Sequence, residues 1–447
     1  MRIIIVGAGA VGSHLADQLS KEHHDVTVIE ENKERMQRLQ DALDILVIQG
    51  NGASPKTLQS AGIENCDLMM ALTNQDEINI VASLTACKSK VPFKIARVSN
   101  MDYYLLDNWL SEDDLGVDLL VNPEFECALQ IRNLLAVPGA SDVAEFGGGE
   151  GIMVGLKVEP GAPCVGETLS EIMLKQDRDY FLIGSISRRG RTLIPTGQTR
   201  LETGDQVFIF CLRSSLDDVY EFCGQKRKQV KRVMILGGSK VAVYLCKMLE
   251  KQRIRATLIE NDEETAEHLA EELDQTLIIQ GEPTNVEMWD LEGIGEADAF
   301  LALTRDDEEN LLSGLIARSK HVPIVIALLE KLEYVPLVNQ VGVNTAVSSR
   351  LAIVDTILKY VRRGNILSVT TLKGNEAEVI EFTATPRCKL LNTPLKDLPA
   401  LPEVLFAMIV RGREIFIPTG HTQILEHDRV VVIAGHTSKR RLEELFQ

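Results

Sequence analysis

The sequence has no long hydrophobic run. None of its apolar segments approaches the roughly 20 residues that a helix needs to cross a bilayer. The N-terminal stretch IIIVGAGAVG has no basic region of any length, and its glycines indicate a turn, so it does not fit a signal peptide. We therefore expect a cytosolic chain with no direct insertion into a membrane.

Paired cysteines are also missing. The eight cysteines are scattered and form no CxxC pair, which argues against a disulfide framework or a zinc site. We expect buried thiols that serve as small apolar residues, and no metal site.

The chain has no excess of positive charge, because its net charge is −18. A nucleic-acid backbone or an anionic membrane surface would repel such a chain, which argues against nucleic-acid binding and direct adsorption to lipid. Short basic clusters occur at residues 188–189, 226–232 and 362–363. We interpret them as solvated linker or hairpin-tip segments; the alternative is docking onto a partner protein.

What the sequence does contain is an internal repeat. CDLMMALTNQDEIN (66–79) matches ADAFLALTRDDEEN (297–310), and IPTGQTRLETGDQVFIF (194–210) matches IPTGHTQILEHDRVVVI (417–433). Gly7 aligns with Gly237 and Glu30 with Glu260 at the same spacing. The blocks follow in the same order, so the chain is a tandem duplication.

Each half divides into two units. In the first unit, apolar runs of strand length alternate with amphipathic helical patterns, which predicts an α/β fold with a doubly wound, Rossmann-like parallel sheet. The expected strands are 2–6, 26–30, 45–49, 67–72 and 93–98, and the helical patterns include 33–41, 75–88 and 123–136. The second unit has strands joined by glycine-containing turns, with a hairpin tip at RRGR, and predicts a small α+β lobe. The expected domains are 1–138, 142–225, 231–363 and 366–447.

A glycine-rich turn follows the first strand. Gly7, Gly9 and Gly12, with Ala10 and Val11 between them, form G-x-G-x-x-G before a helical pattern. The first glycine allows the tight turn, the second lets a pyrophosphate approach the backbone, and the third lets the helix pack against the strand. The helix N-terminus then offers free N–H groups to phosphate oxygens. We predict adenine-nucleotide binding; the alternative is a sheet whose glycines serve packing alone.

Glu30 ends the next strand at about the spacing expected of a carboxylate that accepts from ribose hydroxyls. It disfavours NADP, whose 2′-phosphate would meet a like charge, but leaves NAD, ATP and ADP open. In the second half VMILGGSKVA retains Gly237, and Glu260 is also retained. Ser239 replaces the second glycine, so we expect the second site to be weakened or altered.

Arg97 ends the expected fifth strand in FKIARV, where the second half has Leu328 in IVIALL. The carboxyl ends of the strands of a doubly wound sheet face the ligand crevice, and a guanidinium suits phosphate oxygens. The alternative for Arg97 is an ordinary ion pair with a nearby carboxylate.

Two functions from different classes fit these motifs. An NAD-dependent dehydrogenase needs a general acid or base beside the nicotinamide. The first small unit has no histidine, and His421, His427 and His436 in the second have no recognisable catalytic neighbourhood, so we expect surface or turn residues. We assign no catalytic residue and favour a ligand-sensing regulatory subunit. The apolar helical stretch 350–360 is expected to need a partner chain to cover it.

The sequence resembles the tandem RCK (KTN) domain family, the cytosolic regulatory subunits of Trk-type bacterial potassium uptake. The matching stretches are IIIVGAGAVG, VIEEN, VIQGNGASP, ALTNQDEIN and IARV in the first half, and MILGGSK, LIEND, LIIQGEPT and ALTRDDEEN in the second. The resemblance covers essentially the whole chain. It implies a homotetrameric ring on the inner face of the cell membrane, bound to a potassium-translocating membrane protein and gated by NAD(H) or ATP/ADP.

The resemblance also implies roles for single residues. Gly7, Gly9 and Gly12 would hold phosphate and Glu30 the ribose. Asn51 would lie beside the adenine, and Thr73 and Arg97 would face the phosphates or the nicotinamide side. In the second half Gly237 and Glu260 keep the pattern, and Ser239 departs from it.

Overall fold

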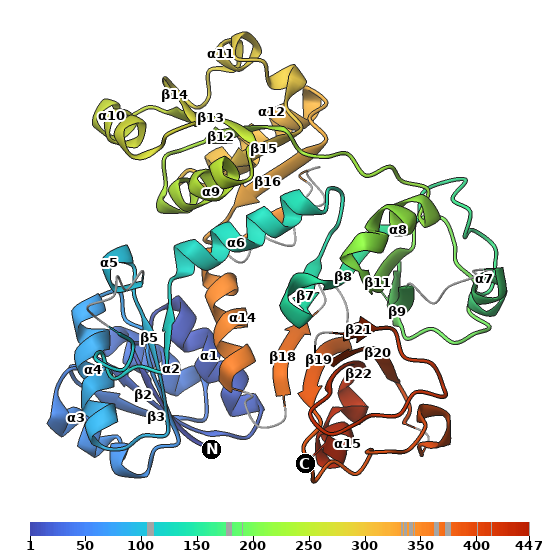
Figure 1. Ribbon diagram of the computed structural model, residues 1–447. Helices are drawn as coiled ribbons and strands as arrows, with labels where there is room; N and C mark the ends of the chain where they lie inside the picture. The colour runs from blue at the N-terminus through green and yellow to red at the C-terminus, as the bar shows by residue number, and fades with distance from the viewer. Residues whose placement is uncertain are drawn as a thin grey trace.

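The computed structural model contains four β-sheets, two parallel and two antiparallel, which alternate along the chain. It describes residues 1–104, 111–175, 181–189, 191–331, 334, 338, 343, 345–361, 366–371, 377–399, 401–412 and 414–446. Figure 1 shows the two parallel-sheet lobes, blue and yellow-green, on either side of α6 and α14, with the two antiparallel lobes beside each other. The predicted duplicated α/β fold is confirmed.

The first parallel sheet has the strand order β3-β2-β1-β4-β5-β6. Its strands are β1 (Arg2–Val6), β2 (Asp25–Glu30), β3 (Leu46–Gln49), β4 (Leu68–Ala71), β5 (Phe93–Arg97) and β6 (Leu119–Val121). Its helices are α1 (Ala10–Lys21), α2 (Lys33–Ala42), α3 (Pro55–Ser60), α4 (Asp76–Lys88), α5 (Met101–Tyr104) and α6 (Pro123–Ala136). Ile3 and Ile5 join one buried cluster and Ile4 and Val6 another, so both faces of the sheet are covered.

The second parallel sheet repeats this order as β14-β13-β12-β15-β16-β17. Its strands are β12 (Arg232–Leu236), β13 (Arg255–Glu260), β14 (Leu277–Gln280), β15 (Ala299–Ala302), β16 (Ile324–Leu328) and β17 (Thr345–Val347). Its helices are α9 (Lys240–Lys251), α10 (Glu263–Glu272), α11 (Val286–Leu291), α12 (Asp307–Ser319) and α14 (Ser349–Val361). In both halves the strand order reverses between the first and fourth strands, which places a ligand crevice at their carboxyl ends.

The last helices of the two parallel-sheet lobes are exchanged between the halves. Ile131 of α6 is buried in one cluster with Leu245 of α9, in the second lobe. Ile357 of α14 is buried in one cluster with Leu15 of α1, in the first lobe. The expectation that a partner chain covers residues 350–360 is therefore wrong, because the other half of the same chain covers this apolar face.

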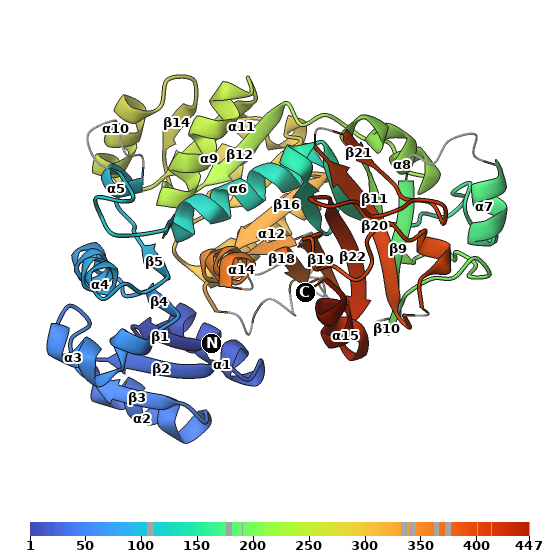
Figure 2. The same ribbon diagram turned by 60° about the horizontal axis from the view of Figure 1, so that its bottom comes forward.

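The two small lobes are antiparallel sheets that pack face to face. The first contains β7 (Val143–Phe146), β8 (Gly151–Lys157), β9 (Phe181–Arg188), β10 (Arg191–Leu193), β11 (Gln206–Leu212), α7 (Leu169–Lys175) and α8 (Leu216–Phe222). The second contains β18 (Ile366–Thr371), β19 (Ala377–Thr383), β20 (Val404–Arg411), β21 (Glu414–Phe416), β22 (Arg429–Gly435) and α15 (His436–Phe446). Phe208 and Phe210 share a buried cluster with Val431 and Ile433 of the other sheet, so one core joins the lobes (Figure 2).

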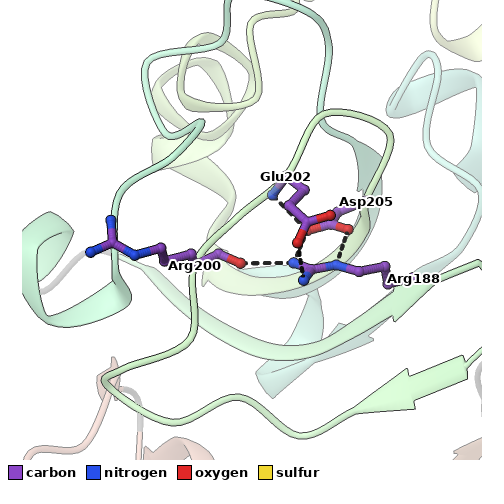
Figure 3. Close-up of polar contacts among 4 residues, drawn as sticks. All are labelled: Arg188, Arg200, Glu202 and Asp205. Carbon is purple, nitrogen blue, oxygen red and sulfur yellow. Dashed lines mark hydrogen bonds and ion pairs between the residues drawn. The ribbon is translucent and has the colours of Figure 1, made fainter.

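A buried carboxylate organises the turn before the last strand of each small lobe. Asp205 is 1% exposed, and its two oxygens accept from Nε and Nη2 of Arg188, each at 2.7 Å (Figure 3). The Arg188 guanidinium also donates to Glu202 and to the carbonyl of Arg200. Hydrogen bonding to Asp205 raises the pKa of Arg188. Asp428 and Arg411 repeat this pair in the second lobe.

The pair corrects one prediction about the basic clusters. Arg188 is not a solvated hairpin-tip residue, because its charge is neutralised by a buried carboxylate. The cluster at 362–363 lies outside the described residues.

Seven of the eight cysteines are buried free thiols, as predicted, and Cys87 on α4 is the exposed exception. Burial raises the pKa of the Cys66 thiol to about 11 and that of Cys246 to about 12. In the part of the chain that the structure describes, no helix combines the length and apolarity needed to span a membrane.

Candidate functional site

The three glycines of the first turn meet three different constraints. Gly7 has φ +102°, a conformation that L side chains rarely adopt. A Cβ on Gly12 would lie 2.0 Å from the Gly7 carbonyl oxygen, so α1 packs on the turn only if this residue is glycine. Gly9 has an ordinary φ of −68°, and a Cβ there would meet nothing within 4 Å. Neither backbone strain nor packing requires a glycine at Gly9, and the close approach of a ligand remains as a physical reason.

The N-terminus of α1 has no side-chain cap. Gly9 is the N-cap residue and has no side chain that could accept from the first N–H groups of the helix. Gln75, the N-cap of α4, also makes no side-chain cap hydrogen bond. Both helices follow strands at the reversal point of the sheet, so two sets of free N–H groups, each with its positive helix end, lie at the carboxyl edge of the first sheet.

In the second half the same two positions are capped. The Ser239 hydroxyl accepts from Ala242 N at 3.4 Å, and Ser239 has nearly the φ of Gly9. The Asp306 carboxylate accepts from Glu309 N at 2.7 Å at the start of α12. The replacement of Gly9 by serine therefore supplies a helix cap, as well as adding a side chain where a phosphate would approach.

Glu30 is 8% exposed and ties the glycine turn to the start of α2. Its carboxylate accepts from Ala8 N at 2.6 Å and from Asn32 N at 2.8 Å. Glu260 makes the same contacts with Gly238 N and Asp262 N. The carboxylate is thus part of the turn in both halves, and a carboxylate with two such contacts still has further acceptor capacity.

Sequence reasoning missed a buried asparagine that joins the ends of β4 and β5. Asn79 is fully buried, and its amide donates to the carbonyls of Thr73 at 3.0 Å and Arg97 at 2.8 Å. Its oxygen accepts from the N–H of Thr73 at 3.0 Å and from the hydroxyl at 2.8 Å. Asn310 makes the same contacts with Thr304 and Leu328. The internal repeat of the sequence contains both asparagines, but it does not predict their hydrogen-bond partners.

Asp76 holds the segment that follows β5. Its carboxylate accepts from Ser99 N at 3.0 Å and Asn100 N at 2.8 Å, and Asp307 repeats this with Glu330 N and Lys331 N. Asn79 thus holds the ends of β4 and β5, where Thr73 and Arg97 lie, and Asp76 holds the loop that follows Arg97.

Arg97 is half-buried and ends β5, as predicted. Its Nε is buried without a hydrogen-bond partner, and no ion pair is found for its guanidinium within the described residues. The expected alternative, an ordinary ion pair, is therefore not observed in the described part of the chain. Asn51 follows β3, is exposed, and accepts from Ala53 N at 2.8 Å.

The crevice of the second half is an open cavity of about 620 Å³ lined by both glycines of the turn. Four carboxylates line it, and Arg305 is the cation among the lining residues. The carboxylates are those of Glu260, Asp262, Asp306 and Glu309. The first half has the neutral Asn32, Gln75 and Ile78 where the last three stand. A second crevice of this charge suits phosphate groups poorly.

Comparison with known proteins matches both kinds of lobe. Models of the TrkA-N domain match residues 3–123 and 233–349, and models of the TrkA-C domain match 153–224 and 379–447. The chain belongs to the TrkA family. It is 36% identical to the Trk system potassium uptake protein TrkA homolog of Archaeoglobus fulgidus, with 100% of both chains covered. It is 33% identical to TrkA of Halomonas elongata, with 100% of this chain and 99% of the relative covered.

Solved RCK structures share the fold. The GsuK channel bound to NAD superposes with a TM-score of 0.61 at 18% identity, and covers 100% of this chain and 78% of the channel chain. GsuK bound to ADP superposes with a TM-score of 0.50 at 14% identity, covering 81% and 69%. The family and the duplicated fold predicted from the motifs are both confirmed.

Proposed function

We propose that this protein is the nucleotide-sensing regulatory subunit of a Trk-type potassium uptake system. Its relatives of 33–36% identity are named Trk system potassium uptake proteins along their full length, which favours this function over a dehydrogenase. NAD(H), ATP or ADP is the proposed effector, bound in the first crevice, and the two GsuK structures named for NAD and ADP support this choice.

The observation that carries the proposal is the start of α1. Gly9 leaves the first N–H groups of the helix uncapped, and no neighbouring atom fills the space where its side chain would be. Phosphate oxygens satisfy such N–H groups, and their charge is favoured by the positive end of the helix. Gly7, Ala10, Val11 and Gly12 would complete the phosphate turn. Glu30, Asn51, Thr73 and Arg97 would face the rest of the nucleotide.

Calorimetry with ATP, ADP, NAD and NADH tests the first crevice. Gly9→Val puts a branched side chain into the phosphate space, and we expect at least a tenfold loss of affinity for every ligand that binds there, or about 1.4 kcal/mol. Ser239→Val, at the matching position of the second half, is the control and should leave this binding unchanged. Unchanged binding of all four ligands in Gly9→Val would contradict the proposal.

Absence of turnover is part of the proposed function. His421 and His427 are exposed, away from the glycine turns in the sequence, and the His436 side chain lies outside the described residues. Cofactor-linked absorbance assays across candidate substrates should stay flat. Reproducible turnover that Glu30→Ala abolishes would restore the dehydrogenase alternative.

We also propose a homotetrameric ring that docks on a potassium-translocating membrane protein, which would place this chain on the inner face of the membrane. Val81 and Leu84 of α4 are 42% and 43% exposed, and Leu312 of α12, the counterpart of Val81, is 61% exposed. Such apolar faces favour self-association. Light scattering should give a tetramer that Val81→Asp with Leu312→Asp dissociates. A monomer of the unaltered chain at micromolar concentration would overturn the assembly.

A further inference from the structure

A basic cavity lies at the opposite end of the second parallel sheet from the nucleotide crevice. It measures about 620 Å³ and lies where β12 and β13 begin, beside the C-terminal end of α6. The segment that links the two halves, at residues 227–231, forms part of its wall. Its six charged lining residues are all basic, namely Arg227, Lys228, Lys231, Arg232, Arg253 and Arg255.

Most of this charge is not neutralised by the protein. Arg227 pairs with Asp217 at 3.3 Å, and Arg232 pairs with Glu296. For the other four, no ion pair is found within the described residues. Those four are exposed and comprise Lys228, Lys231, Arg253 and Arg255. A chain of net charge −18 thus concentrates unpaired positive charge around one cavity.

The first half shows that the fold does not require this charge. Arg232 and Arg255 are directly opposite each other on β12 and β13, whereas the matching pair on β1 and β2 is Arg2 and Asp25. Like charges opposite each other in a sheet are destabilising, and opposite charges are stabilising. The second half therefore carries two like charges at a position where the first half carries opposite ones, although Arg232 also pairs with Glu296.

The turn before β13 is also more basic than the matching turn of the first half. Arg253 has φ 58°, and its counterpart His23 has φ 63°, so the backbone is the same and the charge differs. Lys231 corresponds to Met1 of the first half. At these positions the edge of the second lobe is thus more basic than the matching edge of the first.

We propose that this cavity binds a compact anion with two or more linked phosphate groups. Guanidinium groups from β12, β13 and the preceding turn suit phosphate oxygens, and none of the lining residues is acidic. None of them is aromatic, so the cavity offers no platform for stacking a base. A bound anion relieves the repulsion between Arg232 and Arg255. It also holds the interhalf linker, through Lys228 and Lys231, against the second lobe.

Equilibrium binding of inorganic tripolyphosphate to the full chain tests the proposal. The Gly9→Val background removes phosphate binding by the first crevice. In that background Arg255→Asp should weaken tripolyphosphate binding by about tenfold to a hundredfold, because a charge-assisted hydrogen bond is lost and a like charge faces the ligand. Arg253→His, which installs the first-half residue, should weaken it in the same direction. Binding should also fall as salt rises.

The control is Arg387→Asp, with the same change in net charge at an exposed site in the second small lobe. It should change the affinity by no more than about twofold, since distant exposed charges are screened. Arg255→Asp recreates the charge pair of the first half, so its thermal stability should not fall. Equal affinity in Arg255→Asp and Arg387→Asp overturns the proposal, as does binding of an acidic peptide but not of tripolyphosphate.

Discussion

The two crevices share the same strand order but differ in how the N-termini of their helices are capped and in the residue that ends the fifth strand. In the first, the helices that follow β1 and β4 begin at Gly9 and Gln75 without side-chain caps, and Arg97 lies at the end of β5. In the second, the corresponding helices are capped by Ser239 and Asp306. Leu328 stands where Arg97 would be. One crevice leaves donors free for an anion, and the other satisfies them with its own side chains.

This difference teaches that the fold of a duplicated crevice does not depend on which groups cap its helix N-termini. The buried contacts that shape the crevice are kept in both halves, because Glu30, Asp76 and Asn79 have exact counterparts with the same partners. What changed is the group that satisfies the helix N-termini. A contact also joins the two regions, since Lys240 Nζ at the start of α9 donates to the carbonyl of Ser99, just after β5, at 3.2 Å.

The small lobes are where the halves should prove alike. Asp205→Ala and Asp428→Ala each remove a buried carboxylate from a partly exposed arginine, 24% exposed at Arg188 and 35% at Arg411. Because water can reach the guanidinium that is left, each should lower the free energy of unfolding by about 1.5–3 kcal/mol in urea titrations. Glu202→Ala removes an exposed partner of Arg188 and should cost about 0–1 kcal/mol. A large cost at Asp205 with none at Asp428 would show that the small lobes have also diverged.

Arg97 tests the charge difference between the crevices. Arg97→Ala should weaken ATP binding by about tenfold to a hundredfold, or about 1.5–3 kcal/mol, and affect ADP and NADH less, because only ATP brings a third phosphate. Calorimetry with the three ligands measures this. Arg97→Lys keeps the charge without the planar fork, so its ATP affinity should lie between that of the unaltered protein and that of Arg97→Ala. Equal loss for all three ligands would indicate a general structural effect, and no loss would leave Arg97 without a binding role.

The buried asparagines separate stability from binding. Asn79→Ala and Asn310→Ala both leave buried carbonyls without donors and should each cost about 1–3 kcal/mol of unfolding free energy. Only Asn79→Ala should also weaken nucleotide binding, because it removes the hydrogen bond that holds the Arg97 carbonyl at the end of β5. Paired urea titrations and calorimetry measure the two effects. If both variants weakened nucleotide binding equally, the ligand would not be confined to the first crevice.

Exchanging the helix caps gives the smallest change in stability. Gly9→Ser and Gln75→Asp introduce into the first half the caps of the second, and each should raise stability by a few tenths to about 1 kcal/mol while lowering nucleotide affinity. Ser239→Gly is the reverse change. Thermal unfolding with and without ADP measures both effects. A capped first crevice that still bound ADP at full affinity would refute the role given to the free N–H groups.

Local patterns in the sequence predicted the strands and helices of the first lobe well. The five expected strands and the three expected helices differ from the structure by no more than one residue at either end, but the sixth strand, β6, was not expected. Helix 123–136 has the predicted bounds, and in the structure the Asn122 side chain caps its start, with a proline in the first turn. The four domain limits remain a prediction, since α6 and α14 belong to one lobe by sequence and pack on the other.

Contacts between segments that are far apart in the chain could not be predicted from the sequence. Asn79 and Asp76 stood out by their repetition, but their partners at residues 97–100 lie on another strand and its loop. Ser239 was interpreted as an obstruction, although serine is a favoured N-cap residue and its capping role could have been predicted. Which apolar face α14 covers depends on three-dimensional packing, because several surfaces of the chain are equally apolar.

The exchange of α6 and α14 affects the order in which the lobes can fold during synthesis on the ribosome. The core of the first lobe includes Ile353, Ile357 and Val361, so it is incomplete until about four-fifths of the chain has been synthesised. Domains usually fold one after another as they emerge, with the N-terminal one first. Here the N-terminal lobe lacks α14 until late in synthesis, and the apolar residues that α14 covers stay exposed. The second lobe already has α6 and can complete its core first. A nascent chain that ends between the two helices would therefore expose the apolar residues of the first lobe that α14 later covers.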